Sequence, residues 1–224
     1  MRNIKIAPGE YYHIFNRAVN KQIIFHNSSD YTRFLFLILY FQSAVKISHM
    51  SRAVKDFAKD YKSGQSGQSS ALATVKKRVL ELTAFCIMPN HFHLIVKELE
   101  EGGVAAYMQR VLTAYSKYYN TKYEKSGHVF QGPYGAIHVE DNRQLLHLSA
   151  YIHRNPREIF KWRDIYEEYE WSSYQDFVTA NRWGDLLLPQ IITEHFKSRK
   201  EYGEFLSTST TKLLEEEIPQ YLRT

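Results

Sequence analysis

The spacing of apolar residues along the chain predicts a mixture of strands and helices. Runs of aromatic and branched residues predict extended segments at four places, residues 11–19, 80–89, 91–98 and 128–139. Elsewhere apolar residues recur every three or four positions, which predicts helices. We expect these helices to begin near residue 29, after Gly102-Gly103, and after Asp141, with the last one ending before Pro156. Strands and helices therefore alternate along most of the chain.

The order of these elements predicts an α+β fold. The first six follow β-α-β-β-α-β, the order of ferredoxin-like and RNA-recognition-type (RRM-like) domains. We therefore expect an antiparallel sheet with helices on one face, contained in residues 1–177. Residues 178–224 are expected to form a helical, polar C-terminal extension without recognisable chemistry.

Residues 46–78 differ in composition and are expected to be a basic, flexible insertion. They contain eight Lys and Arg against Asp56 and Asp60, and a run of Gly, Ser and Gln at 63–70 that is typical of a flexible loop. Their net charge of +6 exceeds the +5 of the whole chain, so the rest of the chain is close to neutral. The segment is either a phosphate-binding arm or a solvated insertion, and the sequence leaves both interpretations open.

Composition excludes several classes of protein. With 44% hydrophobic residues, the 224-residue chain can bury a core. The longest apolar run, residues 34–41, is much shorter than the roughly 20 residues of a membrane span, and the N-terminus lacks the apolar stretch of a signal peptide. We therefore expect a cytoplasmic protein without a membrane partner. Cys86 is the only cysteine and is expected in the core, so a metal or acid–base site would have to use the ten histidines.

Two histidines lie two residues apart in a predicted strand. Because side chains alternate along a strand, His91 and His93 leave the same face, as two ligands of one ion must. The pattern alone also fits one surface histidine and one core histidine. A metal site requires a further ligand from another element.

The predicted helix after Asp141 offers such a ligand. His147, Tyr151 and Asn155 are spaced four residues apart and form one polar stripe, which is either functional or simply exposed to solvent. A tyrosine hydroxyl is almost fully protonated at neutral pH, so it attacks only a strongly polarised centre. A divalent ion on a phosphate oxygen provides that polarisation. The two features together therefore suggest a nucleophile beside a metal.

Four motifs occur in order between residues 11 and 177. They run from Tyr12 to Arg17, from Met88 to Ile95, from Tyr151 to Pro156 and from Trp171 to Tyr174. In sequence and spacing they resemble the single-tyrosine HUH transposases of the IS200/IS605 type, and most of all the REP-associated tyrosine transposases. The combination of four motifs is much more specific than any one of them.

The resemblance implies a metal-dependent transposase that nicks and rejoins single-stranded DNA at hairpin-associated sites. It implies that Tyr151 is the nucleophile and that His91, His93 and Asn155 bind the divalent ion, for which magnesium or manganese is favoured. Such enzymes form a 5′-phosphotyrosine bond and leave a free 3′-OH, so the break can be resealed without external energy. Relatives act as monomers or as homodimers, and the sequence does not choose between them.

Other residues are expected to contact the DNA. The candidates for direct contacts are Arg17, Lys76, Lys77, Arg78, Lys117, Lys122 and Arg154, and the candidates for stacking on bases are Tyr12, Phe130 and Tyr134. Two alternatives remain beside the transposase. One is a catalytically silent nucleic-acid-binding ferredoxin-like protein, and the other is a metal-dependent phosphodiesterase that uses water as the nucleophile.

Overall fold

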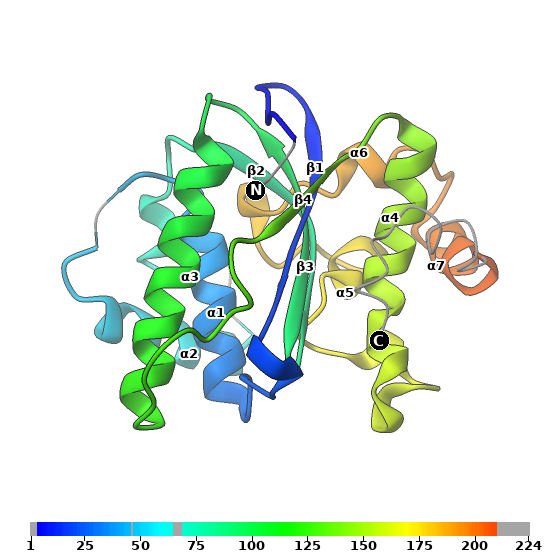
Figure 1. Ribbon diagram of the computed structural model, residues 1–224. Helices are drawn as coiled ribbons and strands as arrows, with labels where there is room; N and C mark the ends of the chain where they lie inside the picture. The colour runs from blue at the N-terminus through cyan, green and yellow to red at the C-terminus, as the bar shows by residue number, and fades with distance from the viewer. Residues whose placement is uncertain (1–3, 46, 65–68, 210–224) are drawn as a thin grey trace.

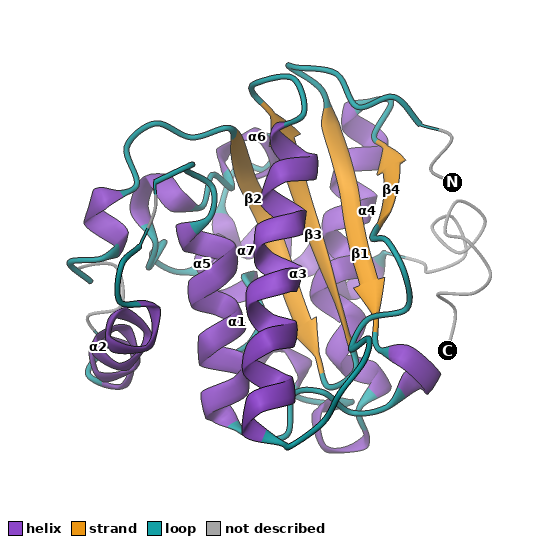
Figure 2. Cartoon of the chain, turned by 60° about the vertical axis from the view of Figure 1, so that its left-hand side comes forward, coloured by secondary structure: helices purple, strands orange, loops and turns teal. Residues whose placement is uncertain are grey.

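The computed structural model describes residues 4–45, 47–64 and 69–209. Its centre is a four-stranded antiparallel sheet in the order β2-β3-β1-β4 (Figures 1 and 2). The strands are β1 (Tyr11–Arg17), β2 (Leu80–Met88), β3 (His91–Glu98) and β4 (Gly135–His138). The three main strands form where the sequence predicts them, and the first six major elements apart from one inserted helix follow the expected β-α-β-β-α-β order.

Helices cover both faces of this sheet, so the expectation of helices on one face is wrong. One face carries α1 (Ser28–Tyr40) and α3 (Gly103–Lys122), which cross in front of the strands in Figure 2. The other face carries α4 (Asn142–Arg154), which contacts β2 and β3. The helix α7 (Arg199–Thr208) contacts α4, the short α5 (Tyr174–Val178) contacts α7, and Figure 1 shows all three on the same side of the sheet. The helix α4 packs on the sheet through an apolar stripe in which Leu145 and Leu148 are buried.

Strand register divides the side chains of the hairpin between the two faces. β2 and β3 are joined by the predicted turn at Pro89-Asn90, and β3 pairs with β1 so that Phe15 lies opposite His93 and Arg17 opposite His91. Alternation along β3 then directs Phe92 to the α1 and α3 face, where its ring centroid lies 5.0 Å from that of Phe34. The two histidines point to the face covered by α4.

The basic insertion contains a packed helix. Residues Met50–Lys62 form α2, in which Val54 and Phe57 are buried against the main core. Their three-residue spacing places both side chains on one face of the helix. Burial of this apolar face stabilises the helix although most of its other residues are charged or polar. The expectation of a flexible insertion is therefore wrong for this part, while residues 65–68 of the Gly, Ser and Gln run lie outside the described residues.

The C-terminal extension is helical only in part, and it is not uniformly polar. It contains α6 (Gln190–Thr193) and α7, separated by turns. Leu187, Ile192, Tyr202 and Leu206 are buried in the same core as the sheet. Residues 210–224 lie outside the described part of the chain.

The N-termini of α4 and α1 are capped differently. The backbone N–H of Gln144 donates to Asp141 Oδ1 over 2.7 Å, and the side chain of Gln144 accepts from the N–H of Glu140, as a capping box requires. By contrast, Asp30 does not cap α1, because its carboxylate is buried and accepts from groups outside the helix. Cys86 is a free, buried thiol as expected. Among the described residues, no helix is long and apolar enough to cross a membrane.

Candidate functional site

His91 and His93 lie side by side on the α4 face of the sheet. Both are buried, and their ring centroids are 5.1 Å apart. His91 Nδ1 donates to Asn90 Oδ1 over 2.6 Å, so the Nε2 of the neutral ring carries a lone pair. That Nε2 lies 3.0 Å from Asn155 Oδ1, which is also an acceptor. Two acceptors that face each other at this distance are arranged to share a cation or a donor.

His93 is held by a third histidine, His13 of β1. His93 Nδ1 and His13 Nε2 are 2.9 Å apart, and the two rings are stacked. In the neutral tautomer whose Nδ1–H donates to His13, His93 Nε2 presents a lone pair. This Nε2 is buried and has no hydrogen-bond partner among the described residues. The structure therefore fixes the orientation of His93 and leaves one of its nitrogen atoms available for a ligand.

The helix α4 brings Tyr151 and Asn155 over the two histidines. The Tyr151 ring meets the His93 ring edge to face, with centroids 5.4 Å apart, and it also packs on Phe15. Asn155 caps the end of α4 and is buried. The third member of the predicted stripe, His147, lies elsewhere, with its ring 5.5 Å from that of Phe205 in α7. Of the predicted stripe, only Tyr151 and Asn155 therefore lie over the two histidines.

Burial dominates the protonation states in this site. It lowers the pKa of His91 to about 3 and that of His93 well below its usual value, which keeps both rings neutral at pH 7. It also lowers the pKa of His13 to about 3. For Tyr151, burial raises the pKa to about 12, although the Asn155 side chain and the Arg17 charge act in the opposite direction. The site therefore contains neutral imidazoles beside a protonated phenol.

A glycine of β4 creates room for the packing under Tyr151. Gly135 lies opposite Phe15 in the β1–β4 pair, and a Cβ there would collide with the Phe15 ring. Any larger residue would displace that ring, which packs against Tyr151. The local sequence does not reveal this close approach, because it depends on the long-range pairing of β1 with β4.

His153 anchors α4 from its opposite side. It follows Tyr151 by two residues, so it points away from the two strand histidines. Its Nδ1 lies 2.6 Å from the Tyr202 hydroxyl and its Nε2 lies 2.8 Å from Ser173 Oγ. Burial lowers the pKa of His153 to about 3. This histidine is structural, and it links α4 to α7 and to the segment beside β2.

The segment that follows Trp171 lies along the outer edge of β2. Ile87 N–H donates to Trp171 O over 2.9 Å, Ser173 N–H donates to Phe85 O over 3.0 Å, and Phe85 N–H donates to Ser173 Oγ over 2.9 Å. Further along, Leu188 N–H donates to Leu82 O. The motif from Trp171 to Tyr174 thus positions the helix that bears Tyr151, through Ser173 and His153.

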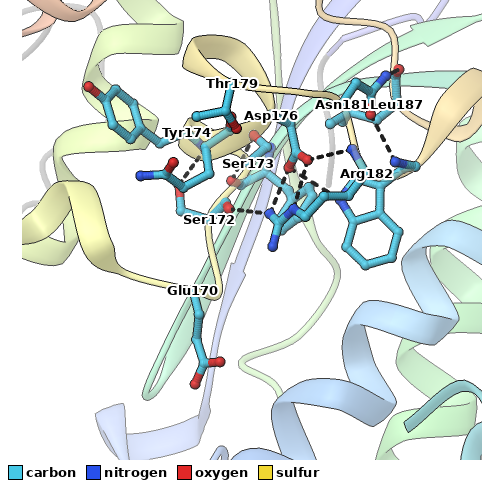
Figure 3. A network of polar contacts seen from close by, with 12 residues as sticks. Glu170, Ser172, Ser173, Tyr174, Asp176, Thr179, Asn181, Arg182 and Leu187 are labelled. Atoms are coloured by element: carbon cyan, nitrogen blue, oxygen red, sulfur yellow. Dashed lines mark hydrogen bonds and ion pairs between the residues drawn. The ribbon is translucent and has the colours of Figure 1, made fainter. Parts of the chain in front are cut away.

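An ion pair fixes this segment, as Figure 3 shows. The buried Asp176 carboxylate accepts from Arg182 Nε over 2.8 Å and from Arg182 Nη2 over 2.7 Å. It also accepts from the backbone N–H of Arg182 and from the indole of Trp183. Burial opposes the charge of Arg182, but the Asp176 contacts outweigh it and raise the pKa of the guanidinium. Arg182 lies beyond the region in which the sequence suggested any role.

The expected DNA contacts are scattered, and only Arg17 lies in the site. Lys76, Lys77 and Arg78 precede β2. The first residue of β2 pairs with Glu98, which lies roughly 25 Å from His91 along β3. Lys117 and Lys122 belong to α3, on the opposite face of the sheet. Arg154 lies beside Asn155 but donates to the Ser209 carbonyl. The stacking candidates Tyr12, Phe130 and Tyr134 are all buried, so that interpretation is wrong.

The residues present fit a divalent ion held by few protein ligands. No group of three His, Cys, Asp or Glu side chains in the described part of the chain could hold a metal. The donor set here is instead two neutral imidazoles and one amide, and its buried His93 Nε2 has no partner. Imidazole suits manganese or zinc, and magnesium becomes suitable when substrate oxygens complete the shell. The orphaned nitrogen is the structural observation that supports such a site.

The fold and this cluster can be compared with those of known proteins. The motif resemblance implies an α+β fold in which a His-x-His pair on the sheet lies beneath a tyrosine on a helix. The structure has this arrangement. Residues 65–155, which include all four clustered side chains, match the family described as "Transposase IS200 like". The resemblance to IS200-like transposases is thus confirmed.

One solved structure shares the fold of this chain. It is described as the structure of a REP-associated tyrosine transposase bound to a REP hairpin. It matches with a TM-score of 0.52 at 14% identity, over 80% of this chain and 84% of that chain. The shared fold agrees with the family that the motifs indicate. No curated protein matches the chain.

Proposed function

We propose that this protein is a metal-dependent transposase that cleaves and rejoins single-stranded DNA at hairpin-associated sites. The family match over residues 65–155 supports DNA strand cleavage as the general activity. The observation that carries the finer proposal is the convergence of Tyr151, His91, His93 and Asn155 in one buried cluster. The relative of known structure was bound to a REP hairpin, which suggests hairpin DNA as the substrate here.

The ligands in this proposal are His91 Nε2, His93 Nε2 and Asn155 Oδ1. When a divalent ion is bound there, it polarises the phosphate that is to be attacked. His13 orients His93 from behind, as a hydrogen-bonded partner orients a ligating histidine in many metal sites. Because all three ligands are neutral, they leave the positive charge of the site available to the DNA.

Tyr151 supplies the nucleophile. Its hydroxyl releases a proton to water and its oxygen forms a bond to phosphorus, while the bond from phosphorus to the 3′-oxygen breaks. The leaving 3′-oxygen takes a proton and becomes a free 3′-OH. The covalent 5′-phosphotyrosine retains the energy of the broken bond, so attack by a 3′-OH reverses the step and rejoins DNA. Packing against Phe15 and His93 restricts the Tyr151 ring before the substrate arrives.

The test is covalent adduct formation with hairpin-bearing single strands from the DNA that flanks the gene for this protein. The strands carry a label at the 3′ end, and the full-length protein is incubated with Mn²⁺ or Mg²⁺. We expect a labelled protein–DNA adduct on a denaturing gel, and we expect Tyr151→Phe to bind the DNA normally but to form none. The matched control is Tyr11→Phe, which removes a hydroxyl at the far end of β1 from Arg17.

Three outcomes would replace the proposal. Unchanged adduct yield in Tyr151→Phe would show that another residue is the nucleophile. If Tyr151→Phe still cleaves while His91→Ala does not, the protein is a phosphodiesterase that uses water. If the protein binds hairpins without cleaving any of them, it acts by binding alone.

A further inference from the structure

Arg17 lies on the same face of the sheet as the proposed metal ligands. It is the last residue of β1 and pairs directly with His91 of β3, so the two side chains leave the same side of the sheet. Its backbone is fixed, because its N–H donates to Asn16 Oδ1 and its carbonyl accepts from Gln131 N–H over 2.7 Å. The guanidinium therefore starts from a rigid part of the sheet.

The guanidinium is buried and forms no ion pair in the described part of the chain. Arg17 is only 4% exposed, and its Nε and Nη1 have no hydrogen-bond partner among the described residues. Glu158 is close enough for the Arg17 charge to oppose the rise that burial causes in the pKa of its carboxyl, but no ion pair joins Arg17 to a carboxylate in the described part of the chain. A buried charge without a direct ion-pair partner carries a desolvation penalty that is only partly compensated. Such an arrangement is maintained when a ligand supplies the missing anion.

The place of Arg17 on β1 puts that anion near Tyr151. Arg17 lies opposite His91, and Phe15, two residues earlier on the same face of β1, packs against Tyr151. The Tyr151 ring also meets the His93 ring, with centroids 5.4 Å apart. In agreement with this geometry, the Arg17 charge opposes the rise in the pKa of Tyr151 that burial causes, whereas the Glu158 charge adds to it. An anion that approaches the tyrosine hydroxyl therefore enters the field of Arg17 as well.

We infer that Arg17 is a catalytic residue that binds the nonbridging oxygens of the phosphate attacked by Tyr151. This inference rests on the proposed function and adds a second positive group to its site. A guanidinium presents paired N–H groups in a plane, which matches two phosphate oxygens better than an ammonium does. Arg17 donates hydrogen bonds and transfers no proton. Its donors stabilise the negative charge that grows on the phosphate as the tyrosine oxygen attacks.

The direct test measures phosphate binding without cleavage. In full-length, ¹⁵N-labelled protein without metal, the Nε–H signal of Arg17 is assigned by its absence in Arg17→Lys and is followed as inorganic phosphate is added. We expect this signal to move. The matched control is Arg33, whose Nε is also buried without a partner but whose guanidinium stacks on Tyr118, across the sheet. A signal of Arg17 that does not move overturns the inference, whether or not the protein cleaves DNA.

The second test asks whether Arg17 acts on the scissile phosphate itself. Arg17→Met should slow adduct formation about 100-fold to 1,000-fold on an ordinary phosphodiester, the usual effect of losing one donor to a developing oxyanion. On a strand with a neutral methylphosphonate at the cleavage position, the same variant should slow the reaction only a few-fold. Equal slowing on both strands would overturn the inference. If phosphate moves the Arg17 signal but wild-type protein forms no adduct, the proposed function fails and the anion site remains.

A stability measurement separates catalysis from a structural role. Because Arg17→Met removes a buried charge that has no partner, we expect the melting temperature to stay equal or to rise. A structural arginine would lower it. Arg17→Lys keeps the charge without the planar pair of donors, so it should retain the fold and still slow adduct formation.

Discussion

Two buried polar clusters lie on opposite faces of the sheet, and they differ in how completely their hydrogen bonds are satisfied. On the α1 and α3 face, the Asp30 carboxylate accepts from four groups. These are His26 N, Tyr118 Oη, Lys122 Nζ and Tyr123 Oη, at 2.6 to 2.9 Å. Each oxygen of Asp30 thus has two donors, and this cluster joins the start of α1 to the end of α3.

In the cluster on the α4 face, the hydrogen bonds of the buried polar atoms are not all satisfied. Buried atoms of Arg17, His93 and Asn155 have no partner in the described part of the chain. Native proteins rarely leave buried polar atoms unpaired, so a local concentration of them calls for a ligand. The Asp30 cluster is therefore satisfied within the fold, whereas the cluster on the α4 face is the one that, in our proposal, binds substrate and ion.

We expect the largest effect on stability from a substitution in the Asp30 cluster, whose hydrogen bonds are satisfied. Asp30→Asn removes a buried charge to which four donors are directed, and we expect it to lower the free energy of unfolding by about 3 kcal/mol at pH 7. Urea denaturation measures this loss. The control is Asp56→Asn on the exposed side of α2, which should change stability by less than about 0.5 kcal/mol. A small loss for Asp30→Asn would show that the cluster contributes little to the fold.

The same substitution carries a pH signature. Burial opposes ionisation of Asp30, but hydrogen bonds from Lys122, Tyr123 and Tyr118 outweigh it and lower the pKa of this carboxyl below 3.8. A carboxyl with a lowered native pKa stabilises the fold above its unfolded pKa, and this stabilisation is lost as pH falls through the native value. The difference between wild type and Asp30→Asn should therefore be largest near neutral pH and should shrink below about pH 4.

An intermediate effect is expected from His13, which acts through His93. His13→Leu removes the partner of His93 Nδ1, so the His93 ring is no longer fixed. We expect Mn²⁺ affinity, measured by calorimetry, to fall about 10-fold to 100-fold, as is usual for such supporting partners. The control His138→Leu removes an exposed contact with Glu10 at the edge of the sheet and should leave Mn²⁺ affinity unchanged. Equal affinity in both variants would show that His13 only fills space.

The smallest stability effect is expected at Asn155. Its Oδ1 faces another acceptor across 3.0 Å, and among the described residues its Nδ2 has only a weak interaction with the Tyr151 hydroxyl. Asn155→Leu has a similar volume, and in metal-free buffer it should change the free energy of unfolding by less than about 1 kcal/mol. In contrast, its Mn²⁺ affinity should fall. A loss of several kcal/mol would place Asn155 with Asp30, as a structural residue.

The sequence predicts the strands and the proximity of Tyr151 and Asn155 to the histidines because these depend on local spacing. Alternation in β3 directs His91 and His93 to one face, and helical spacing directs Tyr151 and Asn155 to one side of α4. The same spacing misplaces His147, because the C-terminal helix α7 covers that end of α4. A segment that contributes to the core from far along the chain is not visible in a local pattern.

Long-range pairing explains what the sequence leaves out. His13 becomes a neighbour of His93, and the predicted DNA contact Arg17 comes to lie opposite His91, only through the β1–β3 register, which joins segments about 80 residues apart. With the register known, the alternation of His13, Phe15 and Arg17 would have identified the face of β1 that meets the two histidines. Similarly, Asp176 and Arg182 act through the edge of β2 and not through any motif of their own.

The segment that follows Trp171 also determines how this sheet can associate with other chains. Its bonds to Ile87 and Phe85, with that of Leu188 to Leu82, occupy the outer edge of β2 along much of its length. An open strand edge is a template for pairing with another chain, and a covered one is protected from aggregation. The sheet has two edges, β2 and β4. Any dimer built by continuing the sheet would therefore have to pair through the short β4, which borders the site, and not through β2, the outer strand of the hairpin.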